Sequence, residues 1–181
     1  MKNLLSGLVL LFLFSITPLV HAGTQVYFSP NGGCQDNVLS AISKAHKSID
    51  IAMYALTSRE IAQAIVKAKE QGITVRIILD RAQIKDHFSK SRFLISKDLD
   101  VKFHIGPGLM HDKFAVIDDR IVLTGSFNWT ASADKKNVEN LLVIMDKELA
   151  GKFDKQFKLL WSQSGQVALN EKTKDSKAHG E

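Results

Sequence analysis

Cysteine is nearly absent from this 181-residue sequence: Cys34 stands alone, so one chain cannot form an internal disulfide. This excludes a disulfide-stabilised scaffold, and stability must come from packing or from association. A strong charge of either sign is also missing, because the formal net charge is only +5. A mildly basic chain attracts polyanions such as nucleic acid or anionic lipid headgroups, but this charge selects neither of them.

The sequence also lacks an uninterrupted apolar run of the roughly 20 residues that a membrane span needs. Its mainly apolar stretch at residues 4–16 follows Lys2 and is followed by Pro18 and the small residue Ala22. This pattern is typical of a secretory signal peptide over residues 1–22, cleaved after Ala22; an uncleaved anchor is the alternative. We therefore expect a periplasmic or secreted protein with no stable membrane association after cleavage.

The length left after this cleavage fits one compact domain that buries most of its apolar surface. Residues 170–181 are polar and charged, a composition typical of disordered segments. We predict a single domain over residues 23–169, between the signal segment and this tail.

Strand-like and helix-like segments alternate in the first half of the domain. Segments rich in β-branched residues alternate with segments whose apolar residues recur at helical spacing, giving expected strands at 24–30, 50–56 and 73–80 and helices at 35–46 and 58–70. Thr57 or Ser58 would cap the second helix and Gly72 would end it. The β-α-β-α-β order predicts an α/β fold with a largely parallel sheet covered by helices.

In the second half of the domain, the sequence predicts a short helix near 89–96, a strand from 101 that runs into a Gly-Pro-Gly turn, and a hairpin. A polar loop at 128–137, a strand at 139–145 and a final helix with its apolar face between Leu149 and Trp161 follow.

Four polar residues of the hairpin are expected to share one face. A tight symmetric turn between the strands starting at Lys113 and Ile121 would place Lys113 opposite Ser126 and His111 opposite Asn128. Asp118 has the opposite parity and would lie off that face. An odd-length loop would break this register.

A histidine and a lysine at the start of a strand usually mark a solvated strand end. Here, however, Ser126 and Asn128 follow Gly125, which permits close approach of the backbone, and a hydroxyl and an amide can both donate to an oxyanion. The combined pattern therefore predicts a phosphate site.

The pattern resembles the signature of the phospholipase D superfamily, H-x-K-x4-D followed by G-S-x-x-N or a close variant. His111, Lys113 and Asp118 form the first part, and Gly125, Ser126 and Asn128 form the second, with the asparagine one place early. A single motif in a short chain with a signal peptide is similar to the small bacterial Nuc-type endonucleases. The resemblance implies a mixed, largely parallel sheet flanked by helices on both faces, and a glutamate, matched by Glu139, that braces the histidine.

The resemblance also implies hydrolysis of phosphodiester bonds through a phosphohistidine, with neither a metal nor another cofactor. His111 would attack phosphorus, while Lys113 and Asn128 stabilise the phosphoryl oxygens. Ser126 would donate locally or orient the lysine and the glutamate, and Asp118 would be a structural member of the motif. The expected protein is an exported, largely non-specific endonuclease acting on DNA, with RNA left open as a second substrate.

Such a mechanism needs two histidines, yet only His111 is followed by a lysine two residues later. A homodimer with one shared active site would supply the second histidine from a second copy. Three other functions remain: a phospholipase D-type lipid phosphodiesterase, a non-catalytic nucleic-acid-binding module, and a metal-dependent nuclease. The last would use His111, Asp112, Asp118 and Asp119, but successive residues on a strand point to opposite faces and cannot easily surround one ion.

Overall fold

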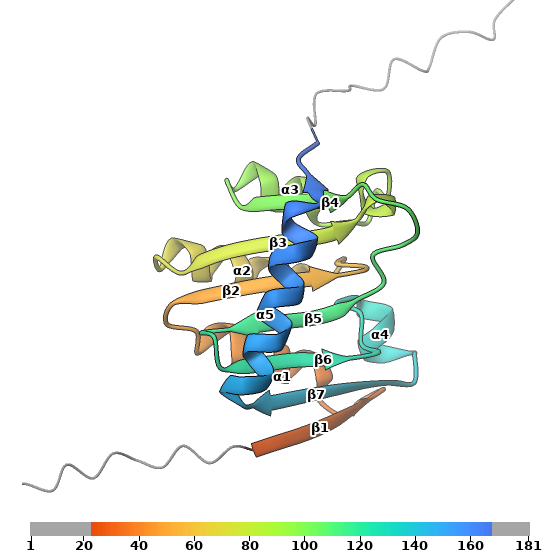
Figure 1. The fold of residues 1–181 in the computed structure, drawn as a ribbon. Coiled ribbons are helices and arrows are strands. Elements are labelled where there is room, and N and C mark those ends of the chain that lie inside the picture. Colours follow the sequence, from red (N-terminus) through yellow and green to blue (C-terminus); the bar gives the residue numbers. More distant parts are fainter. Residues whose placement is uncertain (1–22, 168–181) are drawn as a thin grey trace, which may run out of the picture.

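A computed structural model describes residues 23–167, which form one mixed sheet with helices on both faces (Figure 1). The strands are β1 (Gly23–Ser29), β2 (Ser48–Met53), β3 (Thr74–Asp80), β4 (Asp100–His104), β5 (Lys113–Ile117), β6 (Ile121–Gly125), β7 (Glu139–Met145) and β8 (Ser164–Gly165). The helices are α1 (Cys34–Ser43), α2 (Arg59–Glu70), α3 (Ser91–Ser96), α4 (Ala131–Lys135) and α5 (Lys147–Ser162), with a 3-10 helix η1 (Arg81–Ile84). The predicted signal segment and the predicted tail lie outside the described residues.

The α/β fold is confirmed, and α1 and α2 cover one face of the sheet while α5 crosses the other (Figure 1). Alternation along β2 sends Ile49 and Ile51 into the core beneath α1 and α2, and Ala52 into the core beneath α5. The predicted start of α2 is also confirmed, because Ser58 Oγ accepts a hydrogen bond from the backbone N–H of Ile61.

Parallel pairing is less extensive than predicted. The strand order is β1-β7-β6-β5-β2-β3-β4-β8, and only β2-β3 and β3-β4 pair in parallel. The chain reverses between β5 and β6 through a short turn, and between β6 and β7 through the connection that contains α4, so both pairs of neighbours are antiparallel. Strand β1 pairs with β7 rather than with β2, so the expectation of a largely parallel sheet is wrong.

The register predicted for the hairpin is wrong by one residue. Ile117 lies opposite Ile121 and Phe114 opposite Thr124, so the turn contains three residues, 118–120. Asp118 and Asp119 take positive φ angles of 54° and 56°, a left-handed conformation that aspartate tolerates better than most residues. Extended by one residue, this register sets Lys113 against Gly125 instead of Ser126.

Besides η1, two further short elements were not predicted. Helix α4 lies within the expected polar loop and is capped by Thr130, whose Oγ1 accepts from the N–H of Ala133. Strand β8 adds two residues beside β4. None of the helices within residues 23–167 is long and apolar enough to cross a membrane.

One edge of the sheet gathers the ends of β2, β3 and β6 and the beginnings of β5 and β7. Met53 pairs with Lys113, and the end of β1, Ser29, pairs with Glu139. We call this the site edge, because the residues around positions 111, 128 and 139 all meet there.

Candidate active site

His111 and Lys113 meet at the beginning of β5. Lys113 Nζ lies 2.7 Å from the carbonyl oxygen of His111 and 3.2 Å from its Nδ1. His111 is exposed and Lys113 is half-buried. An ammonium group only donates, so a hydrogen bond between these two atoms requires Nδ1 as the acceptor, which is the tautomer with its proton on Nε2.

The environment of Lys113 favours loss of its proton more than water does. Burial lowers the pKa of Lys113, and the negative charges of Glu139 and Asp112 oppose part of this effect. The two carboxylates therefore help to keep Lys113 in its charged form.

Tyr54, which the sequence analysis did not single out, contacts both residues. Its ring centroid lies 4.6 Å from that of the His111 imidazole, and Lys113 Nζ lies 5.0 Å from the Tyr54 ring centroid. The backbone N–H of Tyr54 donates to the carbonyl oxygen of Asp112 at 3.0 Å. This neighbour was missed because the pairing of β2 with β5 joins segments that lie about 60 residues apart, which local periodicity does not reveal.

Ser126 clamps the end of β6 to the beginning of β7. Its N–H donates to Asn140 Oδ1 at 2.8 Å, and its Oγ accepts from the N–H of Asn140 at 3.0 Å. Gly125 is required just before it: φ is 144°, and a Cβ there would come within 2.3 Å of the Asn140 carbonyl oxygen. Ser126 keeps its own hydroxyl proton to donate.

Asn128 reaches the site edge through its neighbour Trp129. The N–H of Trp129 donates to Ala55, and the carbonyl oxygen of Trp129 accepts from the N–H groups of Thr57 and Ser58. These bonds tie residues 128–129 to the segment that follows Tyr54. Oδ1 of Asn128 is buried without a hydrogen-bond partner among the described residues, so the amide has unused capacity at the site edge.

Glu139 opens β7, opposite the end of β1. Its Oε1 accepts from Asn137 Nδ2 at 3.0 Å. Within the described part of one chain, Glu139 makes no hydrogen bond to His111, so the bracing contact implied by the resemblance is not formed here. Its charge still acts on Lys113.

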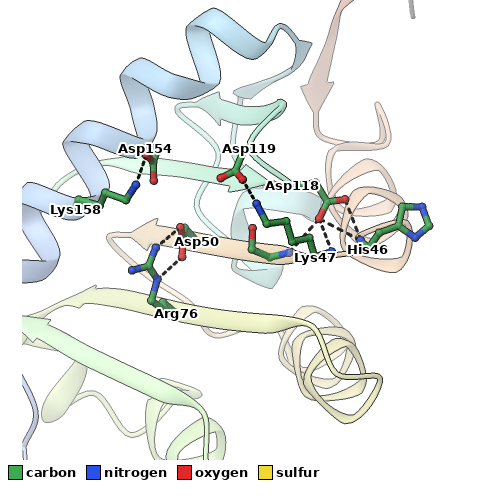
Figure 2. Close-up of polar contacts among 9 residues, drawn as sticks. His46, Lys47, Asp50, Arg76, Asp118, Asp119, Asp154 and Lys158 are labelled. Atoms are coloured by element: carbon green, nitrogen blue, oxygen red, sulfur yellow. Dashed lines mark hydrogen bonds and ion pairs between the residues drawn. The ribbon is translucent and has the colours of Figure 1, made fainter. Parts of the chain in front are cut away.

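Asp118 lies at the opposite end of β5 from Lys113. Its carboxylate accepts the backbone N–H groups of His46, Lys47 and Ser48 at 2.9, 2.7 and 3.0 Å (Figure 2). Burial alone would raise the pKa of Asp118, but these three donors outweigh it and the pKa is lowered. The structure therefore separates Asp118 from the other motif residues.

The same separation argues against the alternative metal site, because its four ligands do not lie together. His111 and Asp112 precede β5, whereas Asp118 and Asp119 follow it, and five strand residues span roughly 17 Å. Within residues 23–167, no three His, Cys, Asp or Glu side chains are grouped as metal ligands. A hollow of about 650 Å³ beside Asp118 and Asp119 does not include His111.

The mixed sheet, with histidine, lysine and asparagine at one edge, is the arrangement of the phospholipase D superfamily. The protein is a phosphodiesterase of this superfamily. The family model described as "Cardiolipin synthase, PLD-like domain" matches residues 38–161. The chain is a member of this phospholipase D-like family, and its structural relatives place it in the Nuc-type branch.

Three relatives illustrate the likeness. A protein named phospholipase D from Rickettsia conorii is 39% identical over 137 residues, which are 76% of this chain and 68% of the relative. The crystal structure of Nuc from Salmonella typhimurium, a phospholipase D family member, has a TM-score of 0.77 and 32% identity, covering 80% of this chain and 97% of Nuc. NucT from Helicobacter pylori has a TM-score of 0.74 and 28% identity, covering 80% and 98%.

Proposed function

We propose that this phosphodiesterase is a metal-independent endonuclease that cleaves nucleic-acid phosphodiester bonds through a phosphohistidine. The observation that carries the proposal is the contact of the Lys113 ammonium with the His111 imidazole at an open sheet edge. This pair offers a nucleophile and a positive charge within reach of one phosphate group. The likeness to Nuc and NucT, which share the whole domain, supports a nuclease.

Substrate binding would itself prepare the nucleophile. A phosphate oxygen is a stronger, charge-assisted partner for Lys113 than imidazole nitrogen, so an entering phosphate draws the ammonium away from Nδ1. The freed ring can then hold its proton on Nδ1 and attack with Nε2. The NH2 group of Asn128 (Nδ2) would donate to a second phosphoryl oxygen.

The covalent cycle has two steps. In the first, a His111 nitrogen forms a bond to phosphorus while the bond to the leaving oxygen breaks, and a second histidine supplies a proton to that oxygen. In the second, this histidine takes a proton from water, whose oxygen displaces His111 from phosphorus. In the complete site, the carboxylate of Glu139 would accept a hydrogen bond from a histidine ring and so hold that ring in place.

The second histidine would come from a second copy of the chain, in a homodimer with one shared active site. Apolar side chains exposed at the site edge support such an interface: Val138 beside Glu139 is 89% exposed, and Phe28 beside Ser29 is 59% exposed. A twofold axis near the phosphate would set the two His111 rings on opposite sides of phosphorus.

Export remains part of the proposal and rests on the sequence pattern of residues 1–22 alone. It would place the enzyme in the periplasm or outside the cell.

A second candidate function is hydrolysis of a phospholipid by the same two steps. The name of the Rickettsia conorii relative, phospholipase D, favours it. Because the reacting group is a phosphodiester in both cases, the site residues alone do not separate the two substrates.

The test is digestion of plasmid DNA by purified protein in excess EDTA, beside release of headgroup from phosphatidylcholine and cardiolipin vesicles. We expect DNA cleavage at full rate with the chelator, none with His111→Asn, and unchanged cleavage with His46→Asn, an exposed histidine at the opposite sheet edge. His111→Asn should still retard DNA in a gel-shift assay. Activity lost on chelation and restored by a divalent ion would refute the phosphohistidine mechanism, and turnover of lipid but not DNA would refute the nuclease.

A further inference from the structure

The ring of Tyr54 lies against both members of the proposed catalytic pair. We propose that Tyr54 is a positioning residue, whose ring holds the His111 imidazole and the Lys113 ammonium in their working arrangement. This inference deepens the proposed function and rests on it for its kinetic consequences. The contacts that motivate it are present whatever the substrate is.

The fold fixes the backbone that carries the Tyr54 ring. Tyr54 follows Met53, the last residue of β2, which is paired with Lys113 in the sheet. Its N–H donates to Asp112, the residue between His111 and Lys113, and the next carbonyl, that of Ala55, accepts from Trp129. The backbone of the half-buried Tyr54 is therefore joined to the same stretch of chain that carries the two side chains its ring contacts.

An aromatic face also stabilises the charges that this site needs. Burial disfavours the ammonium form of Lys113, and a π face 5.0 Å from Nζ offsets part of that cost. Unlike a carboxylate, the ring does not compete strongly with the phosphate for the ammonium. When a His111 nitrogen bonds to phosphorus and the electrons of the broken P–O bond leave with the oxygen, the imidazole becomes cationic. The Tyr54 ring, tilted at 53° to the imidazole, then faces a second cation.

Restricting the imidazole matters because His111 is otherwise exposed at a strand end. An unrestrained side chain there would change rotamers freely, whereas attack on phosphorus requires one orientation. A displacement of about 1 Å at a reacting group can cost on the order of 100-fold in rate. Both contacts use the ring and neither uses the hydroxyl, so phenylalanine should replace tyrosine with little loss.

The kinetic test compares Tyr54→Phe with Tyr54→Leu on bis(p-nitrophenyl) phosphate. Tyr27→Leu is the matched control, since Tyr27 is the chain's other tyrosine and is half-buried in the outermost strand, β1. We expect Tyr54→Leu to lower kcat by roughly 10- to 100-fold while KM changes by less than about threefold. Tyr54→Phe and Tyr27→Leu should stay within about twofold of wild type.

A second measurement does not depend on turnover. In NMR spectra of protein labelled at histidine, the Tyr54 ring should shift the His111 ring protons; Tyr54→Leu should abolish that shift, and Tyr54→Phe should keep it. A Tyr54→Leu protein with wild-type kcat, or with unchanged His111 signals, would overturn the proposal. Equal defects in Tyr54→Phe and Tyr54→Leu would assign the role to the hydroxyl and overturn it as well.

The two proposals fail in different ways. If wild type hydrolyses no phosphodiester, the proposed function fails, and the NMR comparison alone decides whether Tyr54 holds His111. If wild type is active and the spectra of Tyr54→Leu change while its kcat does not, only the positioning role fails.

Discussion

Asp118 is the residue whose place in the molecule differs most from what a linear motif suggests. Five positions after Lys113, it lies beyond the far end of the strand, where its carboxylate joins the β5–β6 turn to the connection between α1 and β2 (Figure 2). Its contribution is to align β5 with β2, and through that pairing to set Lys113 beside Met53 and Tyr54.

We expect Asp118→Asn to lower the free energy of unfolding by about 2 kcal/mol at pH 7, the scale of hydrogen bonds to a charged group. Because the pKa of Asp118 is lowered in the fold, its stabilisation is present above the unfolded pKa of roughly 3.9 and is lost as the pH falls through the folded pKa. Urea unfolding at pH 7 and at pH 3 measures both effects, and the difference from wild type should shrink at the lower pH.

The neighbouring Asp119 provides the control, since its one ion pair within residues 23–167 is with the exposed side chain of Lys47. Asp119→Asn should change stability little at either pH. A well-folded, stable Asp118→Asn protein without activity would contradict a structural role for Asp118.

Helix α5 acts as a unit that closes the face of the sheet opposite α1 and α2 (Figure 1). Its Phe157 is buried in the apolar cluster on this face, with residues of β2, β3, β5 and β6, and the Arg76 guanidinium lies 5.0 Å over the same ring. Arg76 is itself bound by both carboxylate oxygens of Asp50, which raises the pKa of Arg76 and leaves its charge paired beneath the helix (Figure 2).

Phe157→Ala should therefore cost about 3–5 kcal/mol of stability, the range for deleting a buried aromatic side chain. Leu159→Ala, on the exposed side of the same helix, should change stability far less, since Leu159 is 53% exposed and Phe157 is fully buried. Urea-unfolding midpoints at constant m value measure the difference, and equal losses for the two variants would show that α5 does not dock as described.

The whole molecule presents half of the catalytic machinery that the proposed mechanism needs. One chain carries one His-x-Lys pair at one sheet edge, and within residues 23–167 its Glu139 makes no hydrogen bond to its own His111. Both features fit a site that is completed by a second copy.

A covalently linked dimer with one wild-type half and one His111→Asn half tests this. A shared site predicts near-complete loss of turnover, because each cycle uses both imidazoles. The control, with His46→Asn in one half, should keep full activity. About half the wild-type rate in the His111→Asn hybrid, or a monomer fully active on dilution, would contradict the shared site.

The sequence by itself determined those features that depend on neighbours a few residues apart. Helical period, a serine cap and a glycine stop specify α2, and runs of β-branched residues specify β2, β3 and β7. The spacing of His111 and Lys113, two residues apart at the start of a strand, likewise placed both side chains together without knowledge of the fold.

Only the tertiary structure decided which strands are neighbours and in what register. The three-residue turn at 118–120 moved Lys113 opposite Gly125, the edge position of β1 made the sheet more antiparallel than predicted, and the β2–β5 pairing brought Tyr54 to His111. The physical reason is that strand pairing is selected by burial of apolar faces summed over the whole sheet. Contacts between residues 54 and 111 therefore leave no trace in the local period of either segment.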